Sequence, residues 1–384
     1  MAQDIKLGLS LAPAPSSADT LDYSELGDIL DDCFLAYELG YKSVWFQEHH
    51  ATLYHQCPGP LMLLSYLARS CPDLDLGTAC LILPWHNPVR LAGELTTLAG
   101  LTRGDLLIGL GRGTSRDEYY SIGVDMSESR ERFDEVLDIL RLGLSGKPFT
   151  YEGKFHSYPR EVTIHPNPQG RRIHLYGAVG SVPTAQMMAK RCIPPLFTSA
   201  FPNRVLGEML GSWKDHMISA GNSVDVDFTV QGQMLVADTD DEAYALGREY
   251  FPLFFRMLAH HYGVEKAANI NTKGYEDFER VFETYRRWGN VPGAIDQYLE
   301  RQFVGSPESV SRRIQDLVDL GFNSFGFTPH VYGVPKDLRR LSMTRFAREI
   351  APNFSASFRP RSQSQPAASK TTARRNTSEV VHSA

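Results

Sequence analysis

Hydrophobic and polar positions follow two alternating patterns along most of the chain. Short apolar runs of strand length are each followed by a segment in which apolar residues recur with a helical period. In the first such segment Leu26, Ile29, Leu30 and Cys33 share one helical face, and Gly40 follows where a C-terminal cap is expected. The predicted strands occupy residues 5–11, 42–46, 76–83, 105–110, 173–178, 195–198, 228–237 and 325–328.

Alternating strands and helices predict a parallel sheet, and eight such units predict closure into a (β/α)₈ TIM barrel of the α/β class. A doubly wound open sheet is the alternative. Residues 147–168 combine alternation with prolines and are interpreted as an excursion from the barrel. Residues 242–304 are aromatic and largely helical, which indicates a helical insertion before the last strand.

The domain organisation follows from composition. Residues 1–354 are predicted to form a single domain. Residues 355–384 consist mainly of Ser, Thr, Pro, Gln and Arg, and such a segment cannot bury enough apolar surface to offset its ordering entropy. We therefore expect a disordered C-terminal tail.

Charge and cysteine content indicate which binding partners and which covalent cross-links are not expected. A net charge of -6 gives no reason to expect nucleic acid or an anionic membrane, and no apolar run approaches the length of a membrane span. The five cysteines include no Cys-x-x-Cys pair, so neither a disulfide framework nor a metal site is indicated. This cysteine usage fits a reducing, cytoplasmic location.

Residues at the C-terminal ends of barrel strands are the candidates for function. The second strand ends in Glu48, His49 and His50. A histidine there can act as an acid or a base because its pKa lies near neutrality, whereas adjacent histidines lack the spacing of a zinc-binding pair. The alternative is a histidine hydrogen-bonded to loop backbone.

Small residues mark the ends of the next two strands. Gly77, Thr78 and Ala79 would let a flat ring approach the barrel, although close packing of a barrel layer is the interpretation that these residues favour by themselves. Glycines occupy alternate positions 109, 111 and 113, and Arg112 lies between the last two. This spacing suggests that the backbone approaches a ligand closely. Their spacing differs from the dinucleotide fingerprint, and Glu-Tyr-Tyr follows instead of a direct helix start, so a Rossmann site is rejected.

An anion site is predicted beside them. The planar guanidinium of Arg112 suits a phosphate, and Arg130 is a second candidate. Gly180, Ser181 and Thr184 lie at a helix start, where backbone N–H groups and the helix dipole favour an anion. An ordinary helix cap is the alternative for these three residues.

These segments together resemble the bacterial luciferase-like, flavin-dependent monooxygenase family. The resemblance covers nearly everything from residue 5 to residue 353. Its most specific pieces, in chain order, are residues 44–50, 77–80, 83–92, 109–113 and 305–310.

The resemblance implies that reduced FMN lies across the barrel mouth, with its phosphate at the two arginines and the helix start described above. The isoalloxazine ring is then expected over Ala79 and Cys80, where the family commonly has a non-prolyl cis peptide. His49 matches the histidine that serves the luciferases as an acid/base group. Glu48 and His50 are expected to orient it.

The activity implied is that of a two-component monooxygenase. Reduced flavin adds O₂ to give a C4a-peroxide, which oxygenates or oxidatively cleaves a largely apolar substrate such as an aldehyde, ketone or natural-product intermediate. A separate NAD(P)H-flavin reductase is expected to supply reduced FMN, because the chain has no nicotinamide motif. A homodimer is expected by resemblance alone. The luciferase α subunit has a cysteine where this chain has Gly111, which argues against light emission.

The insertion resembles the family's variable region, which forms a lid and part of the substrate pocket. Six of its aromatic residues and one methionine could line an apolar cavity, although plain core packing is the alternative. These residues are Phe251, Phe254, Phe255, Met257, Tyr262, Tyr285 and Trp288.

Two other functions are possible on the same fold. One is hydride transfer with the deazaflavin F420, without oxygen; the run from Glu48 to His50 favours the oxygen-using branch. The other is a non-catalytic flavoprotein, which the presence of His49, Arg112 and Arg130 argues against.

Overall fold

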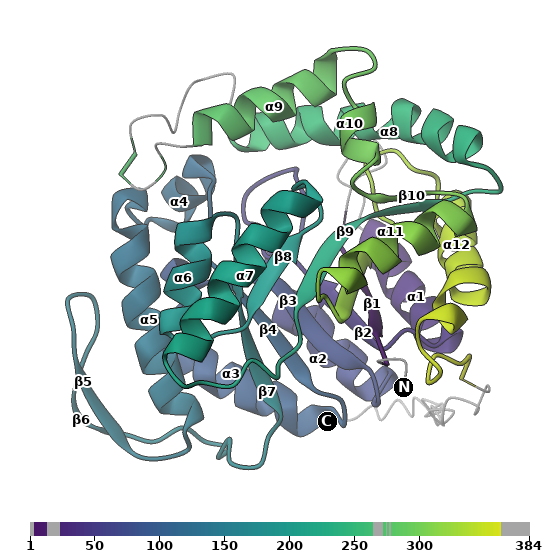
Figure 1. Cartoon of the computed structure of the whole chain (residues 1–384). Coiled ribbons are helices and arrows are strands. Elements are labelled where there is room, and N and C mark those ends of the chain that lie inside the picture. The colour runs from purple at the N-terminus through teal and green to yellow at the C-terminus, as the bar shows by residue number, and fades with distance from the viewer. Residues whose placement is uncertain (1–3, 14–23, 264–271, 274, 276–277, 362–384) are drawn as a thin grey trace, which may run out of the picture.

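The computed structural model describes residues 4–13, 24–263, 272–273, 275 and 278–361. Its centre is a closed barrel of eight parallel strands (Figure 1). In order around the barrel these are β1 (Lys6–Leu11), β2 (Ser43–Phe46), β3 (Asp75–Ile82), β4 (Leu106–Gly111), β7 (Ile173–Ala178), β8 (Pro195–Thr198), β9 (Thr229–Val236) and β11 (Ser324–Thr328). Because β8 pairs with β9 and β11 pairs with β1, no open edge remains. The predicted barrel is confirmed, and the open-sheet alternative is wrong.

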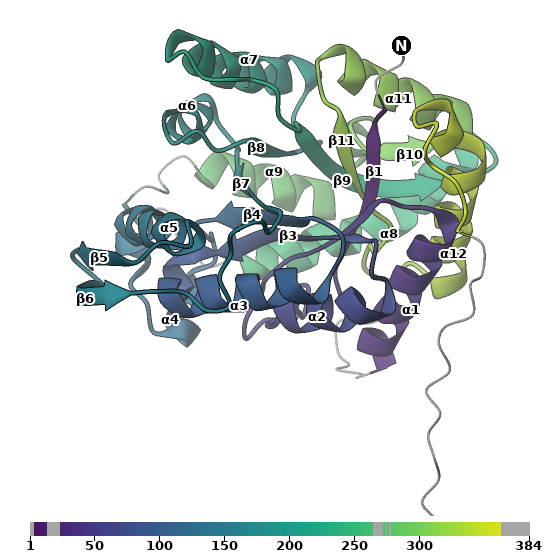
Figure 2. The same ribbon diagram turned by 90° about the horizontal axis from the view of Figure 1, so that it is seen from below.

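Helices surround the strands on the outside of the barrel (Figure 2). They are α1 (Ser24–Leu39), α2 (Pro60–Ser70), α3 (Pro88–Leu101), α5 (Ser129–Leu144), α6 (Val182–Lys190), α7 (Asn203–Ser219), α11 (Pro307–Asp319) and α12 (Lys336–Arg345). Two of them begin with a side-chain cap followed by proline at the first helical position: Asn87 caps α3 ahead of Pro88, and Ser306 caps α11 ahead of Pro307. Gly40 ends α1 with a φ of 102°, which favours glycine.

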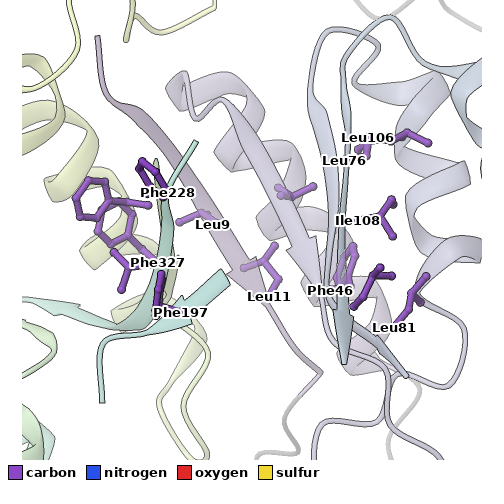
Figure 3. Packing of buried hydrophobic residues seen from close by; sticks show 14 of the residues in the cluster. Leu9, Leu11, Phe46, Leu76, Leu81, Leu106, Ile108, Phe197, Phe228 and Phe327 are labelled. Carbon is purple, nitrogen blue, oxygen red and sulfur yellow. The ribbon is translucent and has the colours of Figure 1, made fainter. Parts of the chain in front are cut away.

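The core follows the two-residue period of the strands. Leu9, Phe46, Ile108 and Phe327 point outward and pack under the helices (Figure 3). The intervening positions point into the barrel, where a separate cluster contains Trp45, Leu107, Tyr176 and Leu196. The barrel is therefore filled by side chains, and ligands are left to its ends.

Two excursions leave the barrel. The predicted one at residues 147–168 is an antiparallel hairpin of β5 (Phe149–Glu152) and β6 (Ser157–Val162). The insertion after β9 contains α8 (Asp240–His261), α9 (Phe278–Asn290), α10 (Asp296–Leu299) and β10 (Phe303–Gly305). Figure 1 shows α8 and α9 side by side across one end of the barrel. None of the described helices is long and apolar enough to cross a membrane.

Two expectations need correction. Glu118, Tyr119 and Tyr120 lie inside a short helix, α4 (Arg116–Ile122), because the Ser115 hydroxyl caps its N-terminus at the N–H of Glu118.

The second correction concerns the tail expected from residue 355. Its first part packs on the barrel: Phe358 is buried against Tyr41, and Arg361 donates to the carbonyl oxygens of Tyr37 and Tyr41. Burial of Phe358 and the two hydrogen bonds of Arg361 order this short part of the segment, although its composition predicts disorder. The rest of the expected tail, residues 362–384, lies outside the described residues.

Candidate active site

A buried carboxylate at the end of β2 organises the first half of the site. Glu48 is 3% exposed, and its two oxygens contact different partners. Oε1 lies 2.8 Å from Nε2 of His50, while Oε2 lies 2.9 Å from Nε2 of His86 and accepts from the N–H of Ile82 at 2.7 Å. Glu48 thus joins the end of β2 to the end of β3 and the turn after it.

A second buried carboxylate organises the other half. Glu118 of α4 is also 3% exposed, and its Oε1 lies 3.2 Å from Nδ1 of His49 and accepts from the backbone N–H of His50 at 2.8 Å. Its Oε2 lies 3.2 Å from Nε2 of His261, the last residue of α8. The predicted residues Glu48, His49 and His50 are therefore brought together, and His86, Glu118 and His261 join them.

Both carboxylates are held ionised. Burial raises the pKa of Glu48, but hydrogen bonds from His50 and His86 outweigh it and lower that pKa to about 2. In the same way burial raises the pKa of Glu118, and the imidazoles of His261 and His49 lower it to about 2. Burial lowers the pKa of His86, but the hydrogen bond and the negative charge of Glu48 outweigh burial and raise it.

An aromatic wall stands beside His49. The ring of Tyr54 lies 5.0 Å from the His49 ring and 4.8 Å from that of His261. His55 contacts Tyr54 and Phe254, and complete burial lowers the pKa of its imidazole far below the usual value, so this ring is neutral. The wall therefore combines residues after β2 with a residue of the insertion.

The aromatic residues of the insertion pack in one buried cluster with Tyr54, and they differ in how closely they approach the wall. Phe254 contacts Tyr54 and His55, as expected for a residue at the site. Phe251 and Phe255 instead pack on Tyr298, and Phe255 also contacts Trp288. For these residues core packing is the correct interpretation.

The end of β3 carries the flat surface expected for a ring. The peptide bond between Ala79 and Cys80 is cis, as the resemblance implies, and both side chains are half-buried above the inner barrel cluster. A Cβ placed on Gly111 would lie 3.1 Å from the Cβ of Cys80, so the glycine allows the two strand ends to approach closely. Gly77 lies deeper, where its missing Cβ leaves room for the Trp45 indole. For Gly77 the close-packing alternative is correct.

Three of the predicted phosphate residues lie at the start of α6, and Arg130 contacts this helix further along, at Met187. The Ser181 hydroxyl caps this helix at the N–H of Thr184 and lies 2.9 Å from the Thr184 hydroxyl. Arg130, an exposed side chain at the start of α5, reaches α6 and lies 3.2 Å from the sulfur of Met187. Gly180 is exposed, and a Cβ placed on it would lie 3.8 Å from Cζ of Phe201, an ordinary contact. Hydroxyls, N–H groups and a cation therefore converge here, a donor set that fits a phosphate.

Arg112 follows β4 on the same side of the barrel. Its guanidinium lies over the ring of Tyr275 at 4.2 Å. Burial raises the pKa of Asp134, and the positive charges of Arg191, Arg130 and Arg112 oppose this rise. The two predicted arginines thus share one neighbourhood. The residues present fit the phosphate and ring of a flavin mononucleotide.

Sequence reasoning missed Glu118 and His261. Glu118 lies in a helix turn introduced by a Ser cap, and a Ser-x-x-Glu pattern at residues 115–118 could have indicated a helix there. His261 carries no local signal, because only the path of the insertion brings the end of α8 to the strand ends.

The sequence of the chain matches a known protein family. The model of the luciferase-like monooxygenase family matches residues 7–324. The chain belongs to this family. It is therefore an enzyme of the flavin-dependent monooxygenase class, as the resemblance predicts.

Three relatives show the range of this family. Limonene 1,2-monooxygenase of Rhodococcus erythropolis is 26% identical over 84% of this chain and 80% of its own. F420-dependent glucose-6-phosphate dehydrogenase of Kineococcus radiotolerans is 24% identical over 85% of this chain and 92% of its own. The oxygenating constituent of 3,6-diketocamphane monooxygenase from Pseudomonas putida, solved with FMN, superposes with a TM-score of 0.70 at 20% identity, covering 92% of this chain and 99% of that one.

Replacement of Glu48 tests the electrostatic organisation of the site. Glu48→Gln should lower the free energy of unfolding by about 1–3 kcal/mol at neutral pH, because the amide leaves a buried donor unsatisfied. Since the pKa of this carboxyl falls from 4.5 to about 2 on folding, its contribution is present above pH 4.5 and is lost as the pH falls toward 2. Urea unfolding followed over this range measures the difference between variant and wild type.

Glu38→Gln, at an exposed position of α1, is the matched control and should change little. A difference between Glu48→Gln and wild type that stays constant down to pH 2 would show that the carboxylate is not stabilised by folding.

Proposed function

We propose that the protein is the oxygenase component of a two-component, FMN-dependent monooxygenase. The observation that carries this proposal is the placement of His49, which a buried carboxylate fixes at the end of β2. The N–H of the preceding residue, Glu48, donates to the carbonyl of Cys80 in the cis Ala79–Cys80 peptide, and the start of α6 at Ser181 follows a strand of the same barrel end. Reduced FMN bound there supplies, with O₂, the oxygen atom that enters the substrate. The protein supplies binding, orientation and proton transfer.

His49 is the proposed acid/base residue. Its Nδ1 lies 3.2 Å from Glu118, so the carboxylate favours the tautomer with the proton on Nδ1. Nε2 is then the nitrogen that exchanges a proton with the reacting groups. Glu118 also accepts from the N–H of His50, which fixes the backbone that carries His49. Glu48 and His50 act as positioning residues through their own hydrogen bond.

The aromatic wall is proposed to exclude water and to bind the substrate. Tyr54 packs against His49, and Phe254 and Tyr332 pack on Tyr54 behind it, so the wall beside His49 is mainly apolar. Such a surface suits an apolar substrate, and an enclosed apolar site protects reactive flavin species from water. The names of the limonene and diketocamphane relatives, which concern apolar terpenoid compounds, support the same substrate class. We propose that α8 and α9 act as the lid over this site.

FMN is favoured over F420 by the diketocamphane relative, which was solved with FMN. That relative is described as an oxygenating constituent, which supports a separate flavin reductase as the partner of this chain. The F420-dependent dehydrogenase in the same family keeps hydride transfer as the second candidate. A homodimer is proposed from the resemblance.

Removal of the His49 imidazole tests its assigned role. His49→Ala should lower turnover by roughly 10²–10⁴-fold, the usual contribution of a positioned acid/base group, while FMN affinity changes little. Substrate-dependent oxygen uptake and a flavin titration measure the two effects separately.

The matched control is His216→Ala, at the end of α7 and away from the site, which should leave both quantities unchanged. Full turnover in His49→Ala would remove His49 from the mechanism.

Removal of Arg112 tests the cofactor site. Arg112→Ala should weaken FMN binding by roughly 10–100-fold, because a charged hydrogen bond to phosphate contributes about 1.5–3 kcal/mol. Fluorescence titration with FMN, repeated with riboflavin, measures the loss; only the phosphate-bearing ligand should respond to the substitution.

The control is Arg103→Ala, whose side chain pairs with Asp73 at the surface. Equal binding of FMN by wild type and Arg112→Ala would place the phosphate elsewhere, and preferential binding of F420 by the wild type would favour hydride transfer.

A further inference from the structure

Two imidazoles and a carboxylate converge at one point of the site in a way that acid/base chemistry alone does not require. Nδ1 of His49, a carboxylate oxygen of Glu118 and Nε2 of His261 all lie within 4.8 Å of one another. The two imidazole nitrogens each lie 3.2 Å from a different oxygen of Glu118. Zinc binds His nitrogen and carboxylate oxygen at about 2.0–2.2 Å, so tetrahedral ligand atoms lie roughly 3–3.5 Å apart. Both His–Glu distances match this separation, and the two imidazole nitrogens, which lie within 4.8 Å of each other, approach further on binding one ion.

His261 provides a second and independent observation. Its side chain is only 2% exposed, and Nε2 faces Oε2 of Glu118 at 3.2 Å as an ion-pair contact, without a well-aligned hydrogen bond to any of the described residues. A buried ring nitrogen that is aimed at a carboxylate without hydrogen-bonding to it has a place for a ligand. The planes of the His49 and His261 rings are nearly perpendicular, at 89°, which lets both nitrogens face one point.

The surroundings of these three residues hold them in place. The other nitrogen of His261, Nδ1, lies 2.9 Å from the hydroxyl of Thr52, which itself accepts from the N–H of Tyr54. The N–H of His50 donates to Glu118. Metal-binding histidines and carboxylates usually have such outer hydrogen bonds, which fix the ring tautomer and orientation.

We propose that His49, Glu118 and His261 form a binding site for a divalent transition-metal ion of the zinc class. The three protein ligands leave a fourth position open, and the part-exposed His49 ring, at 14%, gives a path of entry. Coordination takes the lone pair of each imidazole nitrogen and displaces any proton it carries into solvent. A bound ion would therefore withdraw His49 from proton transfer and inhibit the enzyme reversibly. This inhibition rests on the proposed function, whereas ion binding does not.

Titration of the full-length, tag-free protein with Co²⁺ tests the site without flavin or turnover. Visible d–d bands of a tetrahedral Co²⁺ complex should appear, saturate at one ion per chain and disappear on addition of Zn²⁺. His261→Asn and Glu118→Gln should each weaken binding at least about tenfold, since even loss of an outer hydrogen bond costs 10–100-fold. Circular dichroism confirms that each variant is folded, and the two substitutions act on different elements, so one unfolded variant leaves the other to decide.

The matched control is His216→Asn on α7, which should bind Co²⁺ as the wild type does. Absence of a stoichiometric complex, or binding that both site substitutions leave unchanged, would overturn the proposal. In the wild type, inhibition by Zn²⁺ that EDTA reverses is the expected functional result. Ion binding without inhibition would retain the site and contradict the acid/base role of His49.

Discussion

Two ionised carboxylates buried at the mouth of the barrel are the constraint on which the site depends. A buried carboxylate is costly unless charge and hydrogen bonds compensate it. Glu48 is compensated by His50, His86 and the N–H of Ile82, and Glu118 by His49, His261 and the N–H of His50. Each side chain that satisfies a carboxylate is thereby fixed in position.

The two carboxylates also connect the parts of the fold. Glu48 ties β2 to the end of β3, where the cis Ala79–Cys80 peptide presents its flat surface. Glu118 ties β2 to α4 and to the last turn of α8 in the insertion. A closed parallel barrel brings all these strand ends to one rim, so residues far apart in the chain become neighbours. The chemistry of His49 is thus linked to the placement of both the ring site and the insertion.

Much of this architecture could be predicted from the sequence, because its determinants are local. The eight apolar runs and the caps at Asn87 and Ser306 identify the barrel elements, and the run from Glu48 to His50 identifies one strand end. The sequence also predicts that Arg130 and the start of α6 contribute to one anion site. In the structure Arg130, at the start of α5, contacts α6 at Met187.

The rest could not be predicted because it depends on distant contacts. His49, Glu118 and His261 are separated by long stretches of chain, so no spacing pattern reveals that they converge. How closely each of the insertion's aromatic residues approaches the wall also depends on how α8 packs. The order of residues 355–361 depends on the Tyr41 surface that receives Phe358, a contact that composition cannot reveal.

The central claim is that this site binds reduced FMN and controls its reaction with oxygen. The most direct measurement is stopped-flow absorbance after the protein, loaded anaerobically with reduced FMN, is mixed with oxygenated buffer. We expect a transient spectrum distinct from those of reduced and oxidised FMN, with a lifetime that depends on His49. Direct return to oxidised FMN at the rate of free flavin in solution, in wild type and His49→Ala alike, would contradict it.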